Sequence, residues 1–488
     1  MLNGKLIFRI SSIIVLMEGL IMLLPFCFAC AFREFQTASS FFVIAIICIA
    51  FGGTIHRVSR RQEISMRHFR KDYITVVLCW FVVILIGALP YYLARQGYSF
   101  SDCLFESCAG WTTTGATVMD YADMPRSLIL WKCISSWFGG MGIIVLTTSV
   151  FPRLGIGGQK MAASELPGPA LEKLSARFGD TAKITYSIYI ALTAIEFLLL
   201  LPTGIGTYYA LVNTLASVST GGFINLTASQ TAFVITPYIK GIFALFSMAS
   251  SVCFIGYFYL AIGKWRAALG IYEIKAYFRI IGVLSLLVAI SLFINETYRG
   301  FLNCLGNAVV QVIAFCSTSG YIIDDIGNWP SFCKFALIIA VFIGGCSFST
   351  SGSIKVIRFS VFLRLIHRGI YKRIHPQAIK PVMLGKNVVS ARTASIVASF
   401  ILLFFGLFMF SSLVVSLDNF DMETTFSAVL AVITNNGTGF GKVTGSDFSM
   451  FSAPICLYLT FLMLAGRLEL YTMIIVLSRS YWDNDRTK

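Results

Sequence analysis

Long apolar runs joined by short polar connections are the feature that most constrains the fold of this chain. Many of these runs reach the ~20 residues that an α-helix needs to cross the hydrocarbon core of a bilayer. Charged residues make up only 12% of the chain, about half the share found in a soluble domain. Because backbone polar groups inside a bilayer must be hydrogen-bonded within the protein, we expect an all-α polytopic membrane protein.

Lysine and arginine residues gather in alternate connections between the apolar runs. Most of the 38 basic residues fall in the segments 56–72, 153–183, 264–279 and 355–392, and the last of these contains no acidic residue. Connections rich in lysine and arginine remain in the cytoplasm. We therefore expect these four segments and both termini to be cytoplasmic. The net charge of +15 then reflects membrane orientation, and no nucleic-acid partner is expected.

One unit is repeated four times after a preface of two transmembrane helices. Each unit has a long apolar helix, a short amphipathic segment, a polar loop with a central glycine, and a second long helix. This recurrence in a membrane chain indicates duplicated units around a common axis. The expected boundaries are 1–70 for the preface and 71–160, 161–265, 266–375 and 376–488 for units 1 to 4.

The polar loops, called the filter loops below, read "TTTGATV", "VSTGGFI", "CSTSGYI" and "TNNGTGFG" in units 1 to 4. Their aligned glycines are Gly115, Gly221, Gly320 and Gly437, with Gly439 as the alternative in unit 4. Small polar residues precede each glycine: Thr113, Thr114, Ser219, Thr220, Thr318, Ser319, Asn435 and Asn436.

The amphipathic segment before each filter loop is too short to span a bilayer, so we expect a pore helix that enters from outside and stops midway. Non-helical backbone at that depth must be buried in protein or line water. Glycine can adopt φ > 0 at little steric cost and turn its carbonyl toward an axis. Four such loops would provide oxygen rings that replace the hydration shell of a cation. The pattern therefore predicts a cation selectivity filter.

Five stretches of the sequence resemble the Trk/Ktr/HKT superfamily of potassium transporters, and most closely its bacterial Trk-type pore subunits. They are "WFGGMGIIVLTTSVFPRLGIGGQ" at 137–159, "SELPGP" at 164–169, "GGCSFSTSGSIKVIR" at 344–358, "HPQAIKPVMLGKNVVS" at 375–390 and "GRLELYT" at 466–472. The resemblance implies four M1–P–M2 units around a pseudo-fourfold pore. It also implies that a glycine in every filter loop accompanies K⁺ preference.

The same resemblance implies the localisation, the oligomeric state, the transported ion and the partner of the protein. We expect a multi-pass protein of the bacterial inner membrane that forms a homodimer and carries K⁺ as its transported ion. A cytoplasmic RCK-type nucleotide-binding regulatory subunit is the expected partner, and this chain itself is expected to bind no nucleotide. The basic segment 355–392 is the expected docking surface for that subunit.

The stretch "GGCSFSTSGS" at 344–353, called the gating loop below, interrupts the helix expected from about Pro330 to Ile343. Glycine is unfavourable in a helix by ~1 kcal/mol relative to alanine. The alternative is a helix that simply ends here. The resemblance implies an intramembrane loop that plugs the pore beneath the filter. The implied gate residues are Gly344, Gly345, Cys346, Ser347, Phe348, Ser349, Thr350, Ser351 and Gly352, although Phe348 is larger than the residue expected there.

Arg467 stands within the last apolar run, where an arginine costs several kcal/mol unless it faces water or a partner. The resemblance implies a position in the pore beside the gating loop, as an electrostatic barrier to cations. The alternative is a structural pair with a carboxylate, for which Glu18 and Glu196 are candidates.

Three functions are compared. The expected function is a gated K⁺ uptake pore driven by the membrane potential. The alternative is a symporter that carries H⁺ or Na⁺ with K⁺, although no acidic residue lies in the filter loops. An enzyme is not expected, because the sequence has no nucleophile–base arrangement, no metal-ligand spacing and no phosphate-binding loop.

Overall fold

The computed structural model describes residues 4–478 except 61–70, 95–96, 123, 146–177, 223–235, 323–325, 379, 386 and 469. Most of the basic connection 153–183 and both chain termini therefore lie outside the described residues, as does the motif at 164–169.

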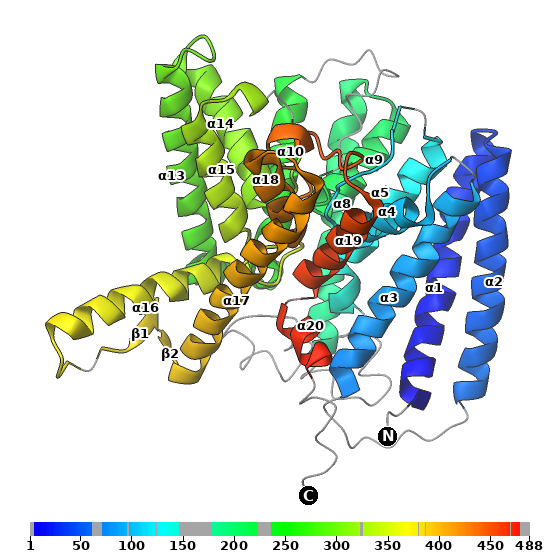
Figure 1. The fold of residues 1–488 in the computed structure, drawn as a ribbon, viewed down its shortest axis with the longest axis horizontal. Coiled ribbons are helices and arrows are strands. Elements are labelled where there is room, and N and C mark those ends of the chain that lie inside the picture. Colours follow the sequence, from blue (N-terminus) through cyan, green and yellow to red (C-terminus); the bar gives the residue numbers. More distant parts are fainter. Residues whose placement is uncertain are drawn as a thin grey trace, which may run out of the picture.

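Within the described residues, six helices are long and apolar enough to cross a membrane, and a strongly bent pair would make a seventh span. The preface is the hairpin of α1 (Gly4–Ala31) and α2 (Phe35–Arg60), which lies at one edge of the molecule (Figure 1). The helices of units 1 and 2 are α3 (Lys71–Leu93), α4 (Phe100–Trp111), α5 (Arg126–Val145), α8 (Phe178–Leu200), α9 (Thr207–Val218), α10 (Pro237–Ser251), α11 (Phe254–Ala261) and α12 (Trp265–Gly270).

Units 3 and 4 follow the same order of long, short and long helices. Their helices are α13 (Tyr272–Ile294), α14 (Phe301–Cys316), α15 (Ser331–Ile343), α16 (Val356–Ile374), α17 (Ala391–Val415), α18 (Met422–Ile433), α19 (Ala453–Arg467) and α20 (Leu470–Leu477). The short 3₁₀ helices are η3 (Leu201–Thr203), η4 (Ile326–Asn328), η5 (Ser416–Asp418) and η6 (Gly441–Val443).

The short helices α4, α9, α14 and α18 occupy the expected pore-helix positions. They contain 12, 12, 16 and 12 residues, so none can cross the ~30 Å hydrocarbon core alone. The helix α4 begins with a capping box between Ser99 and Asp102, and the carboxylate of Asp421 caps α18. Such caps satisfy backbone N–H groups that have no partner within the helix.

Three elements differ from the sequence-based expectation. The second long helix of unit 2 is broken into α10 and α11, which are bent by 90° relative to one another. The basic connection after the gating loop contains the helix α16, which projects away from the other helices (Figure 1). It is followed by a small antiparallel pair, β1 (Val382–Leu384) with β2 (Asn387–Val389).

Candidate selectivity filter and gate

All four filter loops leave their pore helix through the same backbone conformation. The residue after the helix C-cap is left-handed in each loop: φ is 57° at Thr113, 56° at Thr220, 56° at Thr318 and 56° at Asn435. None of these residues is a glycine, so each position carries some backbone strain. The amides of the loop fold back onto the helix, as when Thr113 N–H donates to Gly110 O at 2.9 Å.

The glycine with positive φ comes two residues later in each loop. The angles are 75° at Gly115, 64° at Gly222, 62° at Gly320 and 76° at Gly437. In unit 2 the equivalent glycine is therefore Gly222, and the sequence alignment on Gly221 is wrong by one residue. Gly221 N–H donates to Ala216 O at 2.8 Å, as Thr114 N–H donates to Ala109 O at 2.9 Å in unit 1.

The corrected register also shifts the polar residues of unit 2. Thr220 is the equivalent of Thr113, and Ser219 is the C-cap that corresponds to Thr112. In unit 4, Gly437 has the equivalent positive φ, whereas Gly439 does not.

The glycines bring the four loops into contact with one another. A Cβ atom on Gly222 would overlap the carbonyl oxygen of Ser319, and one on Gly320 would overlap that of Asn436. A Cβ on Gly437 would overlap the carbonyl oxygen of Thr114. These contacts link the loops of units 2, 3, 4 and 1 in that order. The four loops therefore lie around a common centre with their backbones closely packed.

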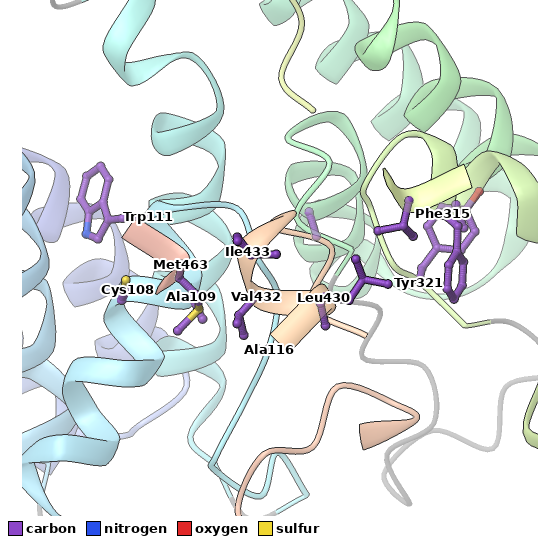
Figure 2. Close-up of a cluster of buried hydrophobic side chains, with 14 of the residues drawn as sticks. Cys108, Ala109, Trp111, Ala116, Phe315, Tyr321, Leu430, Val432, Ile433 and Met463 are labelled. Carbon is purple, nitrogen blue, oxygen red and sulfur yellow. The ribbon is translucent and has the colours of Figure 1, made fainter. Parts of the chain in front are cut away.

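Several polar side chains of the filter loops hold the loops together. The Asn435 side-chain amide donates to the Thr114 hydroxyl at 2.9 Å and to Met463 O at 2.9 Å. The hydroxyls of Thr112 and Thr114 lie 2.7 Å apart. These groups are buried, and apolar side chains from the ends of α4, α14, α18 and α19 surround the loops (Figure 2).

The gating loop packs directly against the ends of the pore helices. Gly352 N–H donates to the Thr318 hydroxyl at 2.7 Å, and a Cβ on Gly352 would overlap Thr434 O. The hydroxyls of Thr350 and Thr220 are 3.2 Å apart. The gating loop thus contacts the filter loops of units 2, 3 and 4. All nine predicted gate residues are largely or fully buried, and Phe348 has a left-handed φ of 58°.

The break between α10 and α11 supplies partners for the gating loop that the sequence did not reveal. Cys346 N–H donates to Ser251 O at 2.9 Å, and the Thr350 hydroxyl donates to Ser250 O at 3.1 Å. Phe254 N–H donates to Phe348 O at 3.0 Å. A helix break leaves backbone groups without intrahelical partners, and the gating loop satisfies them. The stretch "SMASS" at 247–251, in which four of the five residues are small, is the signal that could have indicated the break.

Arg467 is the last residue of α19. The sequence had instead predicted a position in the middle of the last apolar helix. Its guanidinium donates to Thr350 O at 2.7 Å, to Gly139 O at 2.8 Å and to Gly140 O at 3.0 Å. It therefore joins α19 to the gating loop and to α5.

Neither of the two candidate carboxyl groups is a partner of Arg467, whose guanidinium donates to backbone carbonyls. Glu18 and Glu196 are both buried, and none of their carboxyl oxygens has a hydrogen-bond partner among the described residues. Arg467 is therefore not hydrogen-bonded to either of them.

Comparison with known proteins identifies the family of the chain. The TrkH family, described as "Cation transport protein", matches residues 37–269 and 280–484. The chain belongs to the TrkH family. This confirms the predicted resemblance and the all-α polytopic membrane fold, and a member of this family is a transporter rather than an enzyme.

TrkH-family relatives match the chain over nearly its whole length. The Trk system potassium uptake protein TrkH of Salmonella typhimurium is 31% identical over 99% of this chain and 100% of its own. The Escherichia coli protein TrkG, described in the same words, is 29% identical over 98% of each chain. The crystal structure of the potassium transporter TrkH from Vibrio parahaemolyticus superposes with a TM-score of 0.87 at 28% identity, covering 98% of this chain and 100% of that one.

Proposed function

We propose that this chain is the pore subunit of a potassium uptake system and that its four filter loops select K⁺. The observation that carries the proposal is the set of glycine–carbonyl contacts that joins loops of one conformation around a common centre. Such loops can present rings of backbone oxygens to a dehydrated cation. The names of the relatives, which are potassium uptake proteins, support K⁺ as that cation.

The membrane potential is sufficient to drive uptake through such a pore. One charge crossing 100 mV gains ~2.3 kcal/mol. At ~1.4 kcal/mol per tenfold, this supports roughly a 50-fold accumulation of K⁺ inside a negative cell. No further energy source is required for that gradient.

The gating loop and Arg467 are the proposed closed gate. The loop fills the space against the inner ends of the filter loops, and Arg467 adds a positive charge that repels cations there. The basic segment 355–392 is the proposed docking surface for a cytoplasmic nucleotide-binding subunit. Movement of that subunit would reach the gating loop by way of α16, which begins three residues after the loop. The assembly is a homodimer in the bacterial inner membrane with both termini in the cytoplasm.

A coupled symporter of the same fold is the second candidate, and one observation favours it. Glu196 is fully buried in α8, and neither of its carboxyl oxygens is hydrogen-bonded among the described residues. A buried carboxyl group of this kind could exchange a proton during transport. The filter loops themselves carry no acidic side chain, and the uncoupled pore is therefore the conclusion.

Substitution of Gly115 tests the filter. We expect Gly115→Ser to reduce the ratio of ⁸⁶Rb⁺ to ²²Na⁺ uptake into proteoliposomes, because φ is 75° there and a side chain would disturb the oxygen rings. Gly406→Ser is the matched control, since nothing lies within 4 Å of a Cβ at this helical glycine. A Gly115→Ser protein with unchanged selectivity would show that the filter is located elsewhere.

A further inference from the structure

A buried ion pair lies behind the first filter loop. The Lys132 ammonium of α5 is 2.6 Å from the Glu106 carboxylate of α4, and the two side chains are only 2% and 0% exposed. We propose that Lys132 and Glu106 are a positioning pair that fixes the backbone of filter loop 1 and thereby contributes to cation selectivity. This inference rests on the proposed function of the loops as a filter.

The ion pair forms hydrogen bonds with both a carbonyl group and an N–H group of the backbone that follows Gly115. The Lys132 ammonium donates to Ala116 O at 2.8 Å. The second carboxylate oxygen of Glu106 accepts from the Thr117 hydroxyl at 3.0 Å and from Val118 N–H at 3.4 Å. These bonds determine which way the peptides next to Gly115 face.

Three further hydrogen bonds complete the enclosure of this segment. The Tyr121 hydroxyl donates to the Glu106 carboxylate at 2.6 Å. On the other side, Thr117 N–H donates to Ser446 O at 2.8 Å and Phe448 N–H donates to Thr117 O at 2.7 Å. The segment after Gly115 is therefore fastened between the ion pair and the outer loop of unit 4.

The same backbone position has a side-chain donor in each of the three units where the structure describes it. The carbonyl one residue after the filter glycine accepts from Lys132 in unit 1. In unit 3, the Gln311 side-chain amide donates to Tyr321 O at 3.1 Å. In unit 4, the Asn436 side-chain amide donates to Thr438 O at 2.9 Å. An anchored carbonyl here is thus a repeated requirement that three different side chains meet.

Unit 1 differs because its anchor is charged. Gln311 occupies in α14 the position that Glu106 occupies in α4, counted back from the helix C-caps Ser317 and Thr112. A neutral amide suffices in unit 3, whereas unit 1 uses a lysine that requires a carboxylate beside it. Hydrogen bonds from charged groups are shorter and stronger than neutral ones, so unit 1 has the most firmly held segment of the three.

Removal of the ammonium donor should loosen the first loop and admit smaller cations. In proteoliposomes, we expect Lys132→Met to lower the ratio of ⁸⁶Rb⁺ to ²²Na⁺ uptake on the order of tenfold, the size of effect that outer-shell partners have on ion sites. The double variant Lys132→Met/Glu106→Gln removes the unpaired carboxylate and protects folding, and its ratio should be lowered as well. Lys132→Arg keeps a charged donor and should retain more of the selectivity.

The selectivity ratio separates positioning from a general loss of stability. A merely destabilised protein loses both fluxes by the same factor and keeps its ratio. Lys334→Met is the matched control. Lys334 forms a partly exposed ion pair with Glu423, with 3.1 Å between the ammonium nitrogen and the carboxylate oxygen. Glu423 lies in the first turn of α18, at the end opposite to the filter loop. Thr117→Val removes one hydroxyl with almost no change of shape. Thr117→Val should lower the uptake ratio less than Lys132→Met does, and it provides the test if the lysine variants do not fold.

Two results would overturn the inference. One is a folded double variant whose uptake ratio equals that of the wild type. The other is an unchanged uptake ratio in both Thr117→Val and Lys132→Arg, in the case where no other Lys132 variant folds. Gly115→Ser, measured in parallel, distinguishes the two proposals: if it relaxes selectivity and the Lys132 variants do not, only the positioning role fails. If Gly115→Ser also has no effect, the filter assignment itself fails.

Discussion

The two adjacent glycines of unit 2 have different structural requirements. Gly222 has φ of 64°, and a Cβ there would overlap the backbone carbonyl of Ser319, which cannot rotate away. A Cβ on Gly221 would instead meet the hydroxyl of Ser136, which can rotate. We therefore expect Gly222→Ala to cost more than the ~1–2 kcal/mol of left-handed strain and to abolish ⁸⁶Rb⁺ uptake, with a milder effect of Gly221→Ala. Greater damage from Gly221→Ala would contradict the register seen in the structure.

The types of the filter residues could be predicted from the sequence, but their register in unit 2 could not. Small polar residues followed by glycine mark all four loops. The sequence "VSTGG" offers two glycines, and the choice depends on the residue at which α9 ends. Helix ends vary by one or two residues in a way that sequence patterns do not resolve. The hydrogen bond from Asn435 to Thr114 could not be predicted for a different reason, since it joins residues 321 positions apart in the sequence.

At the scale of elements, Arg467 connects α19 to the gating loop and to α5. Arg467→Gln should raise resting ⁸⁶Rb⁺ flux, because it removes a positive charge and the guanidinium that bonds Thr350 O of the gating loop as well as Gly139 O and Gly140 O of α5. Arg467→Lys tests which role dominates. Lysine keeps the charge but lacks the planar fork of donors. Flux near wild type in Arg467→Lys would indicate a charge barrier, and flux as high as in Arg467→Gln would indicate a clamp.

Shortening the gating loop provides the second arm of this test. Deletion within 349–352 should also raise resting flux, and its effect should be less than additive with Arg467→Gln because the two share one contact at Thr350. Melting temperatures of the same purified variants show whether a change in flux reflects lost protein. Fully additive effects would mean that the loop and the arginine act as separate barriers.

The pore helix α18 depends on its N-terminal cap. The Asp421 carboxylate accepts hydrogen bonds from the hydroxyl and backbone N–H of Thr424, which lower the pKa of Asp421. Asp421→Ala should cost about 1 kcal/mol, measured as a lower melting temperature at pH 7, whereas Asp421→Asn keeps a capping oxygen and should cost less. Because the folded pKa is lowered, this stabilisation exists above the ordinary pKa of aspartate and is lost as pH falls through the lowered value. The difference between wild type and Asp421→Asn should therefore shrink in acid.

The sequence predicted those elements that are governed by local patterns. Apolar length and short amphipathic segments predicted the long helices and the pore helices, and the glycine-rich stretch predicted the end of α15 at Ile343. The break between α10 and α11 was missed because the gating loop, about a hundred residues away in sequence, satisfies its backbone groups. The helix α16 was read only as a basic connection, since its charges obscured an apolar face that includes Leu363, Ile366 and Ile370.

At the scale of the whole molecule, four loops from one chain pack around a common centre. The uncoupled pore proposed along this centre would need only the membrane potential to drive uptake. This pore makes a definite electrical prediction. The reversal potential of the current through a K⁺-selective pore should follow the K⁺ gradient and should not change with a pH gradient. A symporter that moves one H⁺ with each K⁺ carries two charges per cycle, and its reversal potential would shift by about 30 mV per pH unit.

Planar bilayers with the purified protein can measure this difference at fixed K⁺ concentrations. We expect no shift when the pH of one side is changed by two units, because the filter loops contain no titratable side chain between Thr112 and Thr117 or between Thr434 and Gly439. Glu196→Gln is the decisive companion variant. If the wild type shifts with pH and Glu196→Gln does not, the buried carboxyl of α8 carries the proton and the protein is a symporter. If neither shifts, the membrane potential alone drives K⁺ through the pore.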